Sequence, residues 1–359
     1  MAREAARLST RDVEERLRRQ GRKLSHATIG NYERGLTQPS EKILGLLAGI
    51  YKRELDWFLG TGLLLRGIRY RALKSVSVHE KKDFKLRAQA WLDAYFYIEG
   101  ILKRKLENRY PSFKVKHDTS GRQLAEKIRS IYKIHDYPVT SAIRILEHFG
   151  IYVIEIGTSA RIDACAGLLG NSRIVVLNES LPNDRIRLTA LHELAHHLYR
   201  DCINGPGLLS EDVEKRAFEF ASHMLLPETQ LERAMRLKSM VRLVQYKERF
   251  GISLAAMIYR ARKSDLIPPN LYKRLWRDFG RLGFRKNEPG HVAADRPLRM
   301  EALLDAAVTD GKITFATVAQ LAGTDESIVE ERIFRAIGGR EQKPRVLDFE
   351  AYNRKIRNN

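Results

Sequence analysis

Apolar residues recur with a helical period along most of the chain. In the run 188–198, for example, they return every three to four positions, as expected for a helix with one buried side. The pattern changes between residues 151 and 178, where short runs rich in β-branched residues are typical of strands. These runs are 151–156, 166–169 and 173–178, and Gly170 and Asn171 form the turn between the last two. The predicted fold class is therefore mainly α and multidomain, with one small sheet.

Caps and linkers divide the helical pattern into four regions. Residues 1–62 predict an all-α domain of short helices, with Ser9, Thr10 and Ser25 as caps. Residues 63–118 are rich in lysine and arginine and predict a basic helical connector. Residues 119–288 combine helices with the sheet in an α+β domain. Residues 286–297, with Pro289 and Pro297, predict a linker, and residues 296–340 predict a small helical unit with a helix-turn-helix rhythm.

The composition adds a charge excess to this picture. The 359 residues carry a formal net charge of +20, which favours a polyanionic partner, although a solvated basic surface gives the same count. No apolar run is long enough to span a bilayer, and the first residues lack the apolar segment of a secretory signal. Cys165 and Cys202 do not make a disulfide framework. We therefore expect a cytoplasmic protein with no membrane partner.

A metal-binding pattern stands in the middle of the apolar run 188–198. His192 and His196 are four residues apart, so on a helix both lie on one face and can hold one metal ion. Glu193 lies beside them, where a carboxylate can act as the general base for a metal-activated water. This HExxH pattern is that of a zinc peptidase helix. The alternative is a chance match on a helix with surface histidines.

Two histidines leave a catalytic zinc ion one protein ligand short. The next predicted helix offers several carboxylates, and Glu214 lies at the edge of its apolar stripe, so we expect it to be the third ligand. Glu211 is the main alternative ligand, and Cys202 is a weaker one. If Glu214 is not a ligand, we expect it to be a surface glutamate in a salt bridge. The expected cofactor is one Zn²⁺ per chain.

Several segments in order resemble the ImmA/IrrE family of zinc metallopeptidases. They are the run 187–196 that leads into HExxH, the strand 174–178 before it and the segment 214–227 after it, and the resemblance extends over about residues 120–290. It implies an α+β zincin-like fold and cleavage of a repressor of the helix-turn-helix class. The chain departs from the family at 216–218, where Arg216 cannot bind zinc and Phe218 replaces a polar residue.

The N-terminal residues resemble a Cro/phage-repressor-type (XRE) helix-turn-helix domain, with the core of the match at Thr28–Gly35. In such domains the second helix of the motif enters the major groove with its N-terminal part. The resemblance implies double-stranded DNA as a partner, and the chain could form a homodimer. The base-contact candidates are His26, Thr28 and Asn31, and the phosphate-contact candidates are Thr10, Arg11 and Arg34. A helical docking module is the alternative.

Three functional hypotheses follow. The first is a DNA-binding transcriptional regulator with a zinc endopeptidase of narrow specificity that cleaves a helix-turn-helix repressor in a stress or mobile-element response. That substrate could include the chain's own joint near residues 60–75. The second is a regulator or toxin–antitoxin-like component whose peptidase fold is a non-catalytic sensor. The third is a scaffold that uses both domains only to bind proteins.

Overall fold

The N-terminal helices enclose a small hydrophobic core of their own. The computed structural model describes residues 3, 6, 8–33, 36–37, 39–52, 65–72, 75–116, 118–158, 161–202, 211–236 and 239–336. Helix α2 (Thr10–Arg19) begins at a capping box in which Ser9 accepts from the backbone of Asp12 and the Asp12 side chain accepts from the backbone of Ser9. Helices α3 (His26–Glu33) and α4 (Glu41–Tyr51) also belong to this unit. The fully buried side chains of Val13, Leu17 and Ile29 lie at its centre.

A four-stranded mixed sheet forms the centre of the rest of the chain. Its order is β1-β3-β4-β2, with strands β1 (Leu65–Ala72), β2 (Ile151–Ile156), β3 (Ile162–Leu169) and β4 (Ser172–Asn178). Strands β3 and β4 form an antiparallel hairpin, and β2 runs parallel to β4. The predicted fold class, mainly helical with one small sheet, is confirmed.

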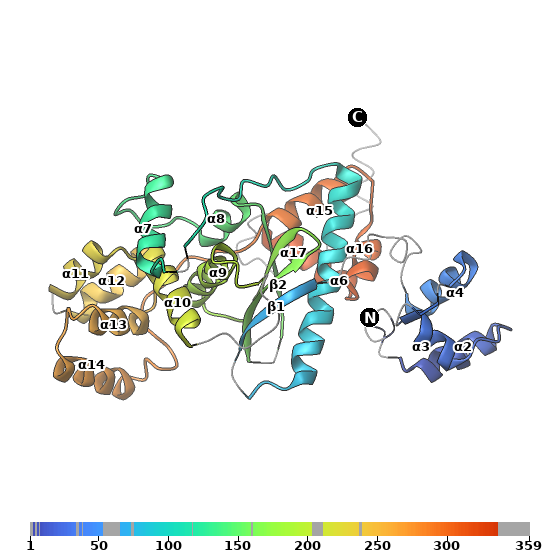
Figure 1. Cartoon of the computed structure of the whole chain (residues 1–359), viewed down its shortest axis with the longest axis horizontal. Helices are drawn as coiled ribbons and strands as arrows, with labels where there is room; N and C mark the ends of the chain where they lie inside the picture. Colours follow the sequence, from blue (N-terminus) through green and yellow to red (C-terminus); the bar gives the residue numbers. More distant parts are fainter. Residues whose placement is uncertain are drawn as a thin grey trace.

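Both faces of this sheet are covered, which explains the continuous apolar runs in β2 and β4. On one face, Val153, Val175 and Leu177 pack in a core shared with α8 (Ala142–His148) and α9 (Asn183–Leu198). On the other face, Ile154 and Val176 pack in a second core shared with α6 (Val78–Leu102). Figure 1 shows the sheet between α8 and α9 on one side and α6 on the other.

Strand β1 was not part of the sequence prediction, which expected only a basic helical connector over residues 63–118. Residues 65–72 instead pair antiparallel with β3 and form an edge of the sheet. The strand lies so close to the chain after α9 that Gly67 has no room for a side chain. A Cβ at this residue, whose φ is +59°, would come within 2.2 Å of the backbone oxygen of Cys202. Leu65 is 1% exposed, so the described part of the proposed cleavage joint at 60–75 is not an open tether.

Helix α6 is also more than a connector. Phe84, Trp91, Leu92 and Tyr95 are buried in the core that it shares with the sheet and with the C-terminal helices. Those helices are α15 (Arg299–Thr309), α16 (Phe315–Ala322) and α17 (Glu326–Ala336). Arg332 joins the two parts, since its guanidinium lies 4.1 Å from the Trp91 ring centre and its Nε lies 3.2 Å from Glu301. The predicted C-terminal unit is therefore docked on α6 and the sheet.

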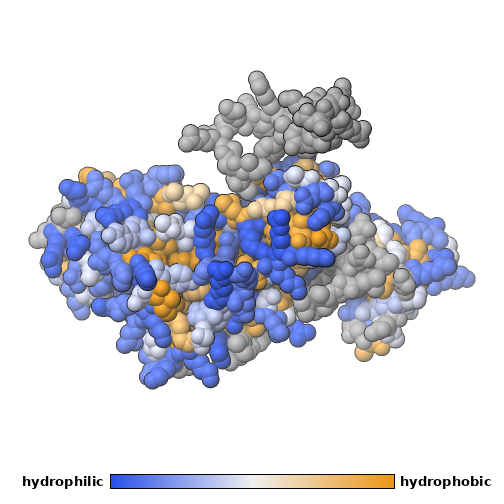
Figure 2. Space-filling model, turned by 90° about the horizontal axis from the view of Figure 1, so that it is seen from above, coloured by the Kyte–Doolittle hydropathy of each residue, from blue (hydrophilic) through white to orange (hydrophobic). Residues whose placement is uncertain are grey.

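The remaining helices lie on the α9 side of the sheet. They are α7 (Gly121–Ile131), α10 (Glu211–Leu225), α11 (Glu228–Arg236), α12 (Met240–Phe250), α13 (Leu254–Lys263) and α14 (Pro269–Arg281). The space-filling view shows a mostly hydrophilic surface, with hydrophobic residues gathered in the central body (Figure 2). No described helix is long and apolar enough to cross a membrane.

Candidate metal centre and DNA-binding surface

Helix α9 carries the two histidines of the HExxH pattern into the protein interior. His192 and His196 are each 2% exposed, and they lie one helical turn apart. Their Nε2 atoms are 3.1 Å from each other, so both imidazoles direct the same nitrogen toward one point. Two nitrogens in this arrangement need a shared proton or a cation between them.

Helix α10 brings Glu214 to the same point. One carboxylate oxygen of Glu214 lies 3.1 Å from His192 Nε2, and the other lies 3.7 Å from His196 Nε2. These three residues offer ligand atoms that all lie within 4.8 Å of one another. Glu211, the main alternative, instead pairs with Lys215 at 3.0 Å and has an 83% exposed side chain. The structure thus brings Glu214 rather than Glu211 to the histidines.

The donor set suits a catalytic zinc ion. Two imidazole nitrogens and one carboxylate are a usual protein ligand set for catalytic zinc, with a fourth position left for water or substrate. The Glu214 side chain is 44% exposed, so this side of the group is open to solvent, while both histidines are shielded. The residues present therefore fit the metal that the HExxH pattern predicts.

Asp201 supports this group and was missed by the sequence analysis. Its Oδ2 lies 3.0 Å from His196 Nδ1. Because a carboxylate only accepts hydrogen bonds, this contact places the proton on Nδ1 and leaves the lone pair on Nε2, which faces His192 and Glu214. Burial opposes a charged imidazole, but the hydrogen bond to Asp201 and the nearby carboxylates together raise the pKa of His196.

The position of Asp201 results from a chain reversal at the end of α9. Arg200 adopts a left-handed conformation with φ of 62°, and the backbone N–H of Asp201 donates to the carbonyl of His196 at 2.8 Å. Arg216 from α10 then contacts Asp201 at 3.4 Å, and its guanidinium lies over the Tyr199 ring at 3.7 Å. Arg216, which departs from the family pattern, thus holds the carboxylate that orients His196.

Glu193 lies next to the histidines in a dry environment. It is 1% exposed, and neither of its carboxylate oxygens has a hydrogen-bond partner among the described residues. Burial raises the pKa of Glu193 to about 7, against the opposing effect of His196 and Arg71. A carboxylate with such a pKa can both take up and release a proton near neutral pH.

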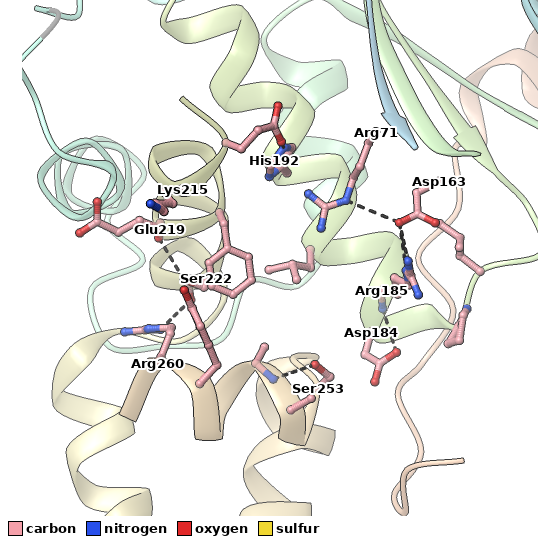
Figure 3. A pocket seen from close by; sticks show the side chains of 18 of the residues that line it. Arg71, Asp163, Asp184, Arg185, His192, Lys215, Glu219, Ser222, Ser253 and Arg260 are labelled. Carbon is pink, nitrogen blue, oxygen red and sulfur yellow. Dashed lines mark hydrogen bonds and ion pairs between the residues drawn. The ribbon is translucent and has the colours of Figure 1, made fainter. Parts of the chain in front are cut away.

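A large cleft of about 2890 Å³ opens beside these residues. His192 and Glu214 line it, together with residues of β1, α9, α10 and α13. Figure 3 shows His192 above the cleft, with Lys215 and Glu219 of α10 on one side and Arg71, Asp163 and Arg185 on the other. An elongated ligand such as a peptide segment fits an open cleft of this size.

The predicted DNA contacts lie on the first two described helices. Arg11 and His26 are exposed, whereas Thr10, Thr28 and Asn31 are partly buried. The Nδ1 of His26 lies 2.8 Å from Glu14, and the Thr28 hydroxyl lies 2.9 Å from that of Ser25, which caps α3. His26 and Thr28 stand in the first turn of α3, the part that a recognition helix presents to bases. Arg34 lies outside the described residues.

Comparison with protein families identifies two parts of the chain. Residues 146–262 match the IrrE N-terminal-like domain of the peptidase M78 family, and residues 1–58 match the helix-turn-helix family. These matches confirm the resemblances noted in the sequence. Strand β1 and helix α6 lie outside both matched segments. A search of curated proteins gave no match.

Proposed function

We propose that this chain, which joins an XRE-type helix-turn-helix DNA-binding domain to a peptidase-family domain of the IrrE N-terminal-like type, is a transcriptional regulator with an active zinc endopeptidase. One observation carries the proposal. His192, His196 and Glu214 direct their ligand atoms to one point at the wall of an open cleft, next to the buried carboxylate of Glu193, which has no hydrogen-bond partner among the described residues.

The proposed mechanism assigns a separate task to each side chain. A zinc ion held by His192, His196 and Glu214 would supply a Lewis acid and lower the pKa of a water molecule. Glu193 accepts the proton of the attacking water and later gives it to the leaving amine. The Glu193 carboxylate is buried and accepts no hydrogen bond from any described residue, so it is available for both transfers. Asp201 keeps His196 in the tautomer that offers Nε2.

The proposed substrate is a protein of the helix-turn-helix repressor class, and specificity is narrow. A protease that shares the cytoplasm with other proteins has to be restrained, and restraint would come from substrate fit, zinc supply or domain docking. A reducing cytoplasm also suits Cys165 and Cys202, which are both free and buried. The joint at 60–75 is a poor substrate in its described part, because residues 65–72 are paired in the sheet.

The test combines metal analysis with a proteolysis assay. Wild-type protein, Glu193→Gln and His192→Ala are incubated with casein and with co-encoded helix-turn-helix repressors, with and without added zinc. We expect one zinc per chain in the wild type, loss of zinc in His192→Ala, and cleavage of one repressor by the wild type alone. Equal cleavage by Glu193→Gln would refute the mechanism, and rapid digestion of casein would refute narrow specificity.

A regulator with a non-catalytic sensor domain is the competing function. It predicts that zinc binds but that no repressor is cleaved at any zinc concentration. A protein that binds neither zinc nor a repressor would leave only the DNA-binding function that the helix-turn-helix domain supports.

A further inference from the structure

One side of the cleft is lined by arginines that the metal centre does not use. Arg71 comes from β1 and Arg185 from the first turn of α9, and both contact the carboxylate of Asp163 in β3. Figure 3 shows the two guanidinium groups on either side of Asp163, with Arg71 directed toward His192. Three separate elements thus bring two positive charges and one negative charge to the same part of the cleft.

The cluster keeps an excess positive charge. Arg185 binds Asp163 through two nitrogens, at 2.7 and 3.1 Å, so this pair is well satisfied. Arg71 approaches the same oxygen only to 3.6 Å, and within the described part of the chain it makes this ion pair and no hydrogen bond. The carboxylate of Asp163 therefore positions Arg71 and leaves most of its donors available for an anion.

Arg71 also lies close enough to the metal centre to influence it. Burial lowers the pKa of His192 and raises the pKa of Glu193. The positive charge of Arg71 lowers both pKa values, so it adds to the effect of burial at His192 and opposes it at Glu193. The Arg71 side chain is 24% exposed and lines the cleft with His192. A ligand group bound by Arg71 would therefore lie beside the reacting part of a bound peptide.

The α10 side of the cleft has the opposite character at its rim. Glu211 and Asp212 line it with side chains that are 83% and 93% exposed, and Lys215 lies between them at 3.0 and 3.9 Å. An acidic side chain of a bound peptide would be repelled from this rim and attracted to the arginine side. The cleft is therefore polarised across the metal centre.

We propose that Arg71 and Arg185 form a subsite for the carboxylate of a glutamate or aspartate side chain next to the scissile peptide bond. The inference rests on the proposed peptidase function and specifies its substrate. Arg71 lies outside the residues that match the peptidase family, because it belongs to β1. The specificity of the cleft is therefore set in part by the segment that follows the DNA-binding domain.

Peptide binding tests the subsite without turnover. The probes are three blocked hexapeptides, acetyl-Ala-Ala-Xaa-Phe-Ala-Ala-amide with Xaa as Glu, Gln or Lys, titrated by calorimetry into zinc-loaded full-length Glu193→Gln protein. We expect the Glu peptide to bind about tenfold more tightly than the Gln peptide, as is typical of a hydrogen bond to a charged group. The Lys peptide should bind most weakly.

Variants in the same Glu193→Gln background assign the preference to residues. Arg71→Met should abolish the preference for the Glu peptide over the Gln peptide, and Arg185→Met should reduce this preference. Arg71→Lys should retain part of the preference because the charge remains. Lys263→Met is the matched control, because it removes a positive charge from the α13 side of the cleft and should leave the preference intact. Zinc content and melting temperature show whether each variant is folded.

Each outcome decides between the subsite and the alternatives. Equal affinities, or no measurable binding of the Glu peptide, would overturn the subsite. A short DNA duplex whose affinity falls in Arg71→Met, with no peptide preference, would assign the arginines to nucleic acid and also overturn it. Cleavage of the co-encoded repressors by the wild type is measured separately, so a Glu preference without repressor cleavage supports the subsite and counts against the peptidase.

Discussion

Removing the Asp201 carboxylate should weaken zinc binding, although Asp201 is not a ligand. Asp201 accepts a hydrogen bond from His196 Nδ1 at 3.0 Å and so keeps the Nε2 lone pair directed at the metal position. Loss of such an outer partner typically costs about 10- to 100-fold in metal affinity, or roughly 1.4 to 2.7 kcal/mol. The structure allows the two substitutions at this position to be ranked within that range.

Asp201→Asn should reduce the zinc affinity by about tenfold, the lower end of that range, because the amide oxygen can still accept a hydrogen bond from Nδ1 and only the charge is lost. Asp201→Ala should lie near the upper end, at about a hundredfold, because the imidazole is then free to change tautomer and orientation. The alanine variant also loses the 3.4 Å contact between Asp201 and Arg216. Its zinc-free melting temperature therefore has to be measured to separate folding from binding.

The assay is competition for zinc with a chromogenic chelator, at fixed pH and salt. Asp212→Asn is the matched control, because it makes the same change of charge at a 93% exposed carboxylate on α10 and should leave the affinity unchanged. A folded Asp201→Ala protein with wild-type zinc affinity would refute the reasoning. An equal loss of zinc affinity in Asp212→Asn would also refute the reasoning, because the affinity would then depend on the net charge of the protein and not on the hydrogen bond to His196.

Three further predictions concern other parts of the chain. Glu193→Gln should keep zinc and lose cleavage of the repressor by at least about a hundredfold, measured under single-turnover conditions, because only the proton acceptor is removed. Burial raises the pKa of Glu228, but hydrogen bonds from His223 and Ser264 and the ion pair with Arg260 lower it to about 2. The stability contributed by the ionised Glu228 carboxylate is complete above the unfolded pKa near 4.3 and is lost as the pH falls toward 2. The free energy of unfolding should therefore drop by on the order of 2 kcal/mol over that pH window in the wild type. In Glu228→Gln the drop should be clearly smaller. Arg11→Ala should weaken binding of the full chain to duplex DNA and reduce the slope of affinity against salt by about one, measured by fluorescence anisotropy; an unchanged slope would contradict the predicted phosphate contact.

The parts of the site that follow from local spacing were predictable. His192 and His196 come together because the helical period places residues four apart on one face. Glu214 could be selected because it borders the apolar stripe of the next helix, and α10 packs directly on α9. In both cases the spacing of residues within one or two neighbouring helices is enough to predict which side chains come together.

The parts that depend on tertiary contacts were not predictable. Strand β1 carries a glycine and arginines rather than an apolar run, and its partner β3 is about ninety residues away with a register shift between Arg66 and Arg69. Asp201 reaches His196 only because Arg200 adopts a left-handed conformation. Residues 286–297 were expected to be a linker, yet Asp295 in this segment is buried and binds the buried Arg187 at 2.8 Å.

The edge position of β1 also affects how the chain can be divided. The last described residue of the helix-turn-helix unit is Lys52 and the first residue of the sheet is Leu65, so few residues separate the two. A fragment that starts after residue 72 would leave the backbone N–H and C=O groups of β3 without partners along one side. Open strand edges of this kind pair readily with other chains. An isolated peptidase fragment should therefore begin before Leu65, because shorter fragments would associate through β3 and lose Arg71.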